Sequence, residues 1–324
     1  MSNFVAIDIE TTGLYPVPGS RIFCVAVNTG KAIMVYQGDE IRRLKALLED
    51  KSITKVIHNA SFDCFWLRML YGIRVRNIWD TRLMEQVLLG ENLPRGNRDE
   101  AMNLQSSSSL KYTLARYKLA ELDKTIGSTF ATRSHTAPLT KAELEYAKND
   151  VRYLLQLQAI QEYRLTKMEL TRVANLENRL VEVVVDMRYR GIGFDVDRWI
   201  KIALQNSYTY NELLKRMPHE VANWNSPAQV KRYFNSRGIP VDSLTTIEEL
   251  LDEYNDPVLR KFIEMRALYK STTTYGEGWL KNDQKGNTVD PDGRVRADFE
   301  QILNSGRFSC SNPNLQQIPA TGTH

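Results

Sequence analysis

The chain has 324 residues, of which 42% are hydrophobic and 25% charged, and its formal net charge is +4. This length exceeds what one hydrophobic core usually organises, so we expect two domains. No apolar run approaches the ~18 residues of a membrane helix, and the N-terminus lacks the pattern of a signal peptide. The cysteines at 24, 64 and 310 lack metal-ligand spacing, which predicts a reducing compartment and no disulfide framework.

The first half of the chain alternates strand and helix patterns. Apolar runs predict strands at residues 4–9, 22–27, 32–36 and 55–58. Amphipathic periodicity predicts helices at residues 40–48, 60–70, 81–89, 110–117 and from 140 past 163. Thr140 and Glu143 form a capping-box pattern at the start of the last of these. The polar stretch 91–109 predicts a mobile loop. Together these patterns predict a mixed α/β domain over residues 1–168.

The second half is mainly helical in pattern. Helices are predicted at residues 170–189, 198–217, 226–236, 247–254 and 257–280. Short polar segments follow Lys281, with a turn signal at residues 290–293. We therefore expect a helical domain over residues 169–285 and a short β-like segment over 286–324.

Two acids lie on the first predicted strand among apolar neighbours. Asp8 and Glu10 are two residues apart, and the period of a strand places both side chains on one face. Buried carboxylates are costly unless a positive charge compensates them, and a metal ion supplies such a charge. The alternative is a strand end that faces solvent.

Two further elements supply polar candidates. Asp63 lies in the first turn of the helix at 60–70, where stabilisation by the helix dipole is its ordinary role. Asn59 precedes that helix and is a candidate N-cap. Tyr146 and Asp150 are four residues apart on the helix that starts at Thr140, so they share a face, which borders the buried side or is simply solvated.

Carboxylates from three separate elements can hold two divalent cations, Mg²⁺ or Mn²⁺, through oxygen ligands. Two such metals are a recurring device for phosphodiester hydrolysis, in which a water is activated and charge on both reacting oxygens is stabilised. A tyrosine hydroxyl beside the site can orient that water.

The same residues resemble a known family. Residues 4–14 (FVAIDIETTGL), 59–63 (NASFD) and 146–150 (YAKND) resemble, in this order, the three motifs of the DEDD exonucleases. The tyrosine is similar to that of the subgroup that includes RNase D, the Werner-type exonucleases and the proofreading domains of family A DNA polymerases. The resemblance implies an RNase H-like fold over residues 1–168.

The resemblance also implies a role for each site residue. Asp8 bridges both metals, Glu10 and Asp150 complete the tighter site, Asp63 holds the second metal through water, and Tyr146 positions the attacking water. Thr11 and Leu14 match positions that touch the terminal nucleotide, and Asn59 matches one near the substrate backbone.

A second resemblance covers the rest of the chain. Residues 185–195, 225–230 and 257–275 are similar to the entry and thumb of the polymerase region of family A DNA polymerases. Residues 305–319 resemble the first palm motif, in which Arg307, Asn314 and Gln317 are the polar members that contact the primer–template. Cys310 departs from the family, which usually has serine there. The resemblance implies a thumb-like domain followed by the start of a palm.

These patterns together predict a 3′–5′ exonuclease that acts on DNA as the proofreading part of a family A polymerase. Its partners are a single-stranded 3′ end and primer–template duplex, with no membrane, in the cytoplasm of a bacterium or a phage-infected bacterium. The chain ends at His324, before the remaining polymerase motifs. We therefore expect no polymerase activity from it alone: it is either cut short or one half of a polymerase whose palm and fingers lie on a separate chain.

Two other readings of the sequence stay open. One is an RNA-trimming exonuclease like RNase D, whose first half would look similar. The other is a non-catalytic DNA-binding subunit of a split polymerase.

Overall fold

The computed structural model describes residues 3–90, 107–122, 125–134, 137–303 and 305–318. Most of the predicted mobile loop at 91–109 lies outside these residues. The described residues divide into two compact units, those up to 192 together with 296–318, and those from 193 to 295. The predicted boundaries at 168 and 285 do not coincide with these units, and the division into three functional domains stays a prediction. Among the described residues, no helix is long and apolar enough to cross a membrane.

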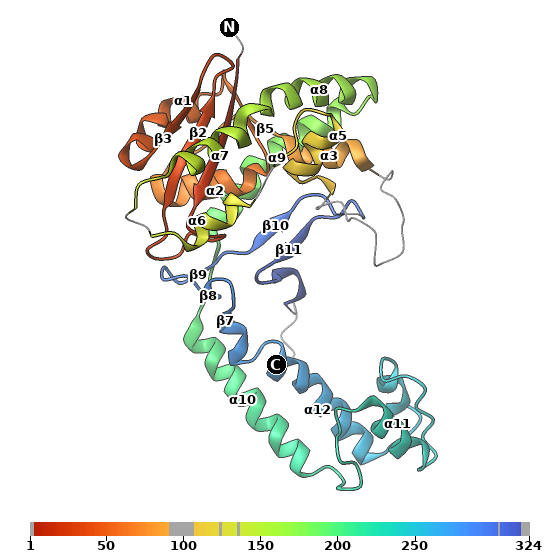
Figure 1. Cartoon of the computed structure of the whole chain (residues 1–324). Helices are drawn as coiled ribbons and strands as arrows, with labels where there is room; N and C mark the ends of the chain where they lie inside the picture. The colour runs from red at the N-terminus through yellow and green to blue at the C-terminus, as the bar shows by residue number, and fades with distance from the viewer. Residues whose placement is uncertain (1–2, 91–106, 123–124, 135–136, 304, 319–324) are drawn as a thin grey trace. The chain divides into compact units, whose positions relative to one another are not determined.

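A five-stranded mixed sheet organises the first unit (Figure 1). Its order is β3-β2-β1-β4-β5, with β2 antiparallel to its neighbours β1 and β3, and with β1, β4 and β5 parallel. The strands are β1 (Phe4–Thr11), β2 (Ile22–Asn28), β3 (Ile33–Tyr36), β4 (Thr54–Ile57) and β5 (Ile78–Asp80). The first four confirm the predicted strands, and the sheet confirms the predicted α/β class. Sequence patterns missed β5, because three residues are too few to show a period.

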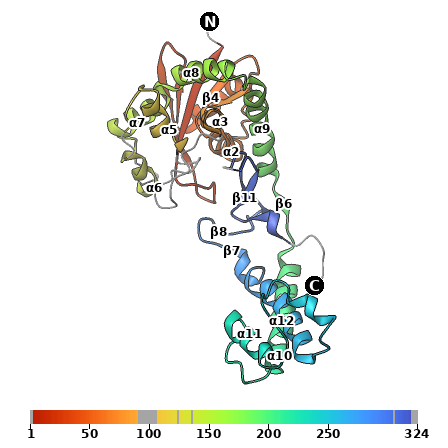
Figure 2. The same ribbon diagram turned by 90° about the vertical axis from the view of Figure 1, so that its right-hand side faces the viewer.

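Helices cover both faces of this sheet. The α-helices of the first unit are α1 (Lys45–Glu49), α2 (Ala60–Tyr71), α3 (Thr81–Leu89), α5 (Leu110–Arg116), α6 (Thr129–Thr132), α7 (Lys141–Arg152), α8 (Leu154–Lys167) and α9 (Thr171–Arg190). Two 3-10 helices, η1 (Gly38–Leu44) and η3 (Ile126–Ser128), complete the set that the structure describes before α9. Figure 2 shows the sheet between α5 and α7 on one side and α2, α3 and α9 on the other.

The alternation of side chains along β1 decides which layer each residue meets. Ile7 and Ile9 enter a core with α1, α2, α3 and α9, whereas Ala6 enters a second core with α5, α7 and α8. Because side chains two apart share a face, Asp8 and Glu10 face α7 together with Ala6. The fold therefore directs both acids of β1 toward the helix that carries Tyr146 and Asp150.

Two predicted helices differ in the structure. The helix predicted from 140 past 163 is interrupted at Tyr153, where the backbone leaves ideal helical geometry (φ −104°, ψ −2°), and it continues as α8. The helix predicted at 40–48 is a 3-10 helix followed by the five residues of α1. Amphipathic spacing does not distinguish a continuous helix from two short ones, since both keep the buried face.

The last residues of the first unit are anchored by charge. They form β10 (Asp298–Glu300), β11 (Ser309–Ser311) and η6 (Leu315–Gln317). The Asp298 carboxylate pairs with the buried Arg188 of α9 and accepts a hydrogen bond from the Tyr15 hydroxyl. The Asn312 side-chain amide donates to the Tyr15 hydroxyl at 3.0 Å and to the Asp298 carboxylate at 3.1 Å.

The second unit is mainly helical, as predicted. Its elements are α10 (Val196–Lys215), α11 (Pro227–Asn235), η4 (Ile247–Leu251), α12 (Pro257–Thr273), η5 (Glu277–Leu280) and the short strands β7 (Lys281–Asn282), β8 (Gly286–Asn287) and β9 (Arg294–Val295); β6 (Ile192–Gly193) lies at the boundary between the units. Trp224, Phe234 and Phe262 form an aromatic core with ring centroids 5.8–6.2 Å apart.

Candidate active site

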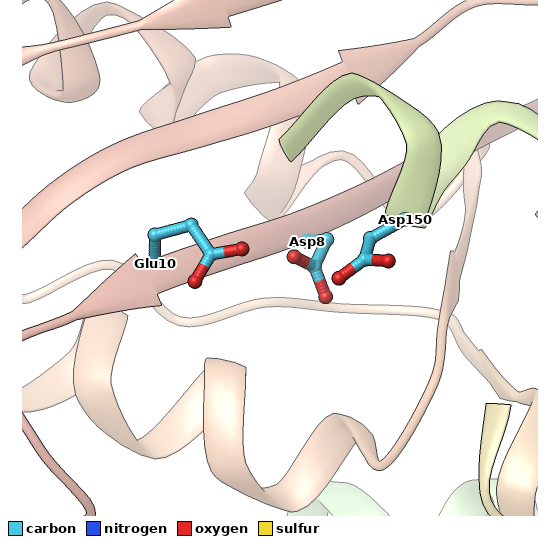
Figure 3. A group of neighbouring side chains, drawn as sticks. All are labelled: Asp8, Glu10 and Asp150. Carbon is cyan, nitrogen blue, oxygen red and sulfur yellow. The ribbon is translucent and has the colours of Figure 1, made fainter. Parts of the chain in front are cut away.

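Three carboxylates meet between β1 and α7. Asp8, Glu10 and Asp150 each offer an oxygen, and these oxygens lie within 4.8 Å of one another. Figure 3 shows the Asp8 and Asp150 carboxylates side by side, with the Glu10 carboxylate directed toward them. Asp8 and Glu10 are half-buried and Asp150 is buried. The structure thus brings together three of the acids that the sequence named as metal ligands, and their role as ligands stays a prediction.

The negative charge of this group changes the acidity of its neighbours. Burial raises the pKa of the Tyr146 phenol, and the charges of Asp150, Glu10 and Asp8 raise it further, with a hydrogen bond to the Asp150 side chain adding to the shift. Burial also raises the pKa of the Cys24 thiol, and Glu10 and Asp8 add to that shift. The burial of the phenol and the surrounding carboxylates thus both favour the protonated form of Tyr146, which can donate a hydrogen bond.

Asp63 lies near this group but outside the set of three. It sits in the first turn of α2, is 3% exposed, and accepts a hydrogen bond from the backbone N–H of Ile9 at 3.1 Å. Burial raises the pKa of Asp63 well above its usual range, and the charge of Asp8 raises it further. One carboxylate oxygen of Asp63 is thus tied to the strand between the two acids of β1.

The entry to α2 is built differently from the prediction. Asn59 occupies the N-cap position with a left-handed backbone (φ 66°), but its side chain makes no cap hydrogen bond. Its Oδ1 instead accepts from the guanidinium of Arg82 at 2.8 Å. The predicted capping role of the Asn59 side chain is therefore wrong, because a residue outside α2 takes it.

That residue is Asp80, which sequence analysis missed. Its carboxylate accepts from the backbone N–H groups of Asn59 (3.1 Å) and Ala60 (2.7 Å) at the start of α2. The same carboxylate accepts from Arg82 and Leu83 and thereby caps α3. An aspartate just before a helix is a recognisable capping signal, but nothing local indicates that it also caps a helix 20 residues earlier.

The residues predicted to contact nucleic acid lie in separate segments. Thr11 ends β1, where its hydroxyl donates to the carbonyl of Gly13 at 2.8 Å, and Leu14 is 65% exposed just beyond. In the C-terminal segment of the first unit, the Asn314 side chain accepts from Gln316 N–H at 3.1 Å, and Arg307 and Gln317 are exposed. Their contacts with nucleic acid stay predictions.

A cavity of about 410 Å³ adjoins the acidic group on the α7 side. It is lined by Ala120, Glu121, Leu122, Ile126, Ala142, Glu145, Tyr146, Asn149, Asp150 and Tyr153. Its volume lies in the range of small-molecule sites, so the side chains of Tyr146 and Asp150 border open space.

Three half-buried or buried carboxylates within 4.8 Å repel one another strongly unless cations neutralise them. Their donor atoms are all oxygens, the ligands preferred by hard divalent cations such as Mg²⁺ and Mn²⁺. The residues present therefore fit a divalent metal site.

Comparison with known proteins agrees with this geometry. Residues 1–165 match the model of a family described as 3′-5′ exonuclease. DNA polymerase I of Rhizobium leguminosarum is 30% identical over 301 residues, which cover 87% of this chain and 28% of that protein. DNA polymerase DpoZ of Acinetobacter phage SH-Ab 15497 is 24% identical, with 98% of this chain and 56% of that protein covered.

A solved structure matches the fold of the whole chain. The POL domain of Pol1 from M. smegmatis, in complex with DNA primer-template and dNTP, aligns with a TM-score of 0.70 and 18% identity. The match covers 98% of this chain and 52% of that chain. The present chain thus spans about half the length, or less, of these relatives.

Proposed function

Because this chain belongs to the family of 3′–5′ exonucleases, we propose that it removes nucleotides from the 3′ end of DNA at the site of Asp8, Glu10 and Asp150. The observation that supports this proposal is the meeting of these three carboxylates beside the Tyr146 hydroxyl. We further propose that Asp63 contributes to the same site, since Asp8 raises its pKa through their proximity.

In this proposal the carboxylates would hold two divalent ions, and such ions would supply an activated water and neutralise charge on the phosphate. Asp8 and Glu10 enter from the strand and Asp150 from α7, so the two elements hold the site from two directions. The bond from Ile9 N–H fixes the Asp63 carboxylate beside β1. Tyr146 retains its proton and orients the attacking water by hydrogen bonding.

Association with a polymerase belongs to the same proposal. Two of the similar proteins carry the name DNA polymerase I or DpoZ, and the fold match is to a polymerase domain bound to primer-template. We infer that the site trims primer ends and that the buried Thr11 at the end of β1 and the exposed Leu14 just beyond it lie toward the terminal nucleotide. Such an enzyme should remove a mismatched primer terminus faster than a matched one.

The test is degradation of a 5′-labelled single-stranded DNA oligonucleotide and of the RNA of the same sequence, with Mg²⁺ or Mn²⁺. We expect stepwise shortening of the DNA from its 3′ end and loss of activity with EDTA. Asp8→Ala should lower the rate by about 10³-fold, since a bound metal contributes several kcal/mol to catalysis.

Asp39→Ala is the matched control. Asp39 is a fully exposed acid whose contact with Arg42 is 3.7 Å long, so its removal should leave the rate unchanged. Faster cleavage of the RNA would instead assign an RNA exonuclease. If wild type and Asp8→Ala both leave every substrate intact, the enzymatic proposal fails and a DNA-binding subunit is favoured.

A further inference from the structure

Gly127 of η3 lies directly against the end of the Tyr146 side chain. A Cβ atom placed on Gly127 would lie 2.6 Å from the Tyr146 hydroxyl oxygen and 3.3 Å from the ring carbon Cζ. Gly127 does not have a positive φ, so its backbone conformation is open to other residues. The close approach of the tyrosine is therefore what requires glycine at this position.

The segment that carries Gly127 is fastened to its surroundings. Phe130 of α6 is buried, and its ring centroid lies 6.0 Å from that of Tyr146 and 6.0 Å from that of Phe23 on β2. The Arg133 guanidinium lies 4.8 Å over the Phe23 ring and is 3.0 Å from the Glu143 carboxylate. Aromatic contacts and a shielded ion pair thus hold the segment against β2 and α7.

The ion pair between Arg133 and Glu143 also reaches the start of α7, the helix that carries Tyr146. Glu143 accepts from the Thr140 N–H at 2.7 Å and belongs to the capping box of α7. Arg133 therefore ties the glycine-bearing segment to α7 three residues before Tyr146. The tyrosine is bounded by its own helix on one side and by Gly127 and Phe130 on the other.

We propose that Gly127 is a positioning residue that sets where the Tyr146 hydroxyl lies relative to Asp150. This inference rests on the proposed exonuclease function, in which that hydroxyl orients the attacking water. An ordinary contact between a carbon and an oxygen is about 3.4 Å, so a methyl group at 127 displaces the hydroxyl by roughly 0.8 Å. The tyrosine tip moves rather than the backbone, because the atom that the methyl group meets is the end of a side chain that can rotate.

The predicted consequence separates activity from stability. A displacement of this size in a catalytic group lowers a rate by about 10- to 100-fold. The melting temperature should change little, since a rotation of the tyrosine relieves the contact. Affinity for the DNA strand should also change little, because Gly127 faces the tyrosine rather than open space.

The experiment measures kcat and KM on a single-stranded DNA oligonucleotide, with Mg²⁺, for wild type, Gly127→Ala, Tyr146→Phe and the double variant. We expect Gly127→Ala to lower kcat by about 10- to 100-fold with KM within about twofold. The double variant should be no slower than Tyr146→Phe, since phenylalanine lacks the oxygen that the methyl group would displace. Gly278→Ala is the control, because a Cβ there meets no atom within 4 Å.

Two results overturn the inference while leaving the proposed function intact. The first is a Gly127→Ala enzyme as fast as an active wild type. The second is a Gly127→Ala loss that persists in full on top of Tyr146→Phe, which would show that the glycine acts through some other group or through folding. An inactive wild type overturns both the proposed function and the inference that rests on it.

Discussion

Replacement of Asp80 by alanine should destabilise the first unit far more than loss of an ordinary helix cap. The Asp80 side chain is 2% exposed and accepts four backbone N–H bonds, two at the start of α2 and two at the start of α3. Alanine leaves all four donors without their acceptor at two helix ends inside the fold. Buried N–H groups without partners are among the costlier defects of a folded chain.

The magnitude follows from these four bonds. A helix cap contributes about 1 kcal/mol and a hydrogen bond to a charged group about 1.5–3 kcal/mol. Burial raises the pKa of Asp80, so the cost of holding a buried charge offsets part of the sum. We expect Asp80→Ala to lower the free energy of unfolding by about 3–5 kcal/mol, the range for breaking a buried charged network.

Asparagine separates the contribution of the two carboxylate oxygens. Oδ1 accepts from three of the four N–H groups and Oδ2 accepts only from Ala60. Asp80→Asn keeps an oxygen for the three bonds and places an NH₂ group against the Ala60 N–H. Its cost should be about 1–3 kcal/mol, between wild type and Asp80→Ala.

The assay is urea unfolding followed by circular dichroism and tryptophan fluorescence. Asp256→Ala is the control, since Asp256 caps α12 in the second unit with two bonds of 2.8 Å, to Val258 and Leu259. The free energy of unfolding of Asp256→Ala should be about 1 kcal/mol lower than that of the wild type. The reasoning is refuted if Asp80→Ala loses no more than Asp256→Ala, or if alanine and asparagine at 80 are equally destabilising.

Two further predictions concern charge. Burial lowers the pKa of Lys55 to about 8, below the value of about 10.4 in an unfolded chain. Between these two pH values the unfolded chain binds more protons than the folded one, so the free energy of unfolding should rise with pH. Lys55→Met should lose that rise when the urea midpoints at pH 8 and pH 10 are compared. An equal rise in both proteins would contradict this assignment. In EDTA, Asp8→Asn should raise the free energy of unfolding by about 1 kcal/mol or more, because it removes one of three carboxylates within 4.8 Å of one another. With metal present, the same variant should have no nuclease activity. A lower free energy of unfolding in EDTA would mean that the acids do not repel one another in the metal-free protein.

Local patterns predicted the parts of the fold that depend on local causes. Strand β1 was readable from its apolar run, and the capping box of Thr140 and Glu143 is present in the structure. The acids of the site were readable because strand and helix periods fix which side chains share a face. A break such as the one at Tyr153 was not readable, since no proline or glycine marks it.

The two residues of the site region that sequence reasoning missed depend on distant contacts. Asp80 serves α2 from a position 20 residues later in the chain. Gly127 matters only because the tip of Tyr146 reaches it from another helix. No pattern in a single sequence specifies which side chain lies against which backbone across such a separation, so these roles required the structure.

The size of side chains on the two faces of the sheet explains why the acids come so close. On the face toward α7, Ala6 is the neighbour of Asp8 along β1. On β2, Ala26 lies opposite Asp8 and Cys24 lies opposite Glu10. The helix meets this face with Ala147, three residues before Asp150, and all of these small side chains are fully buried.

The opposite face carries the larger Ile7, Ile9, Val25 and Val27. Small residues let a helix approach a sheet closely, whereas isoleucine and valine at the same positions would hold it away. The alternation of large residues on one face with small residues and acids on the other thus does two things. It builds the main core, and it brings α7 near enough for carboxylate oxygens from two elements to lie within 4.8 Å of one another.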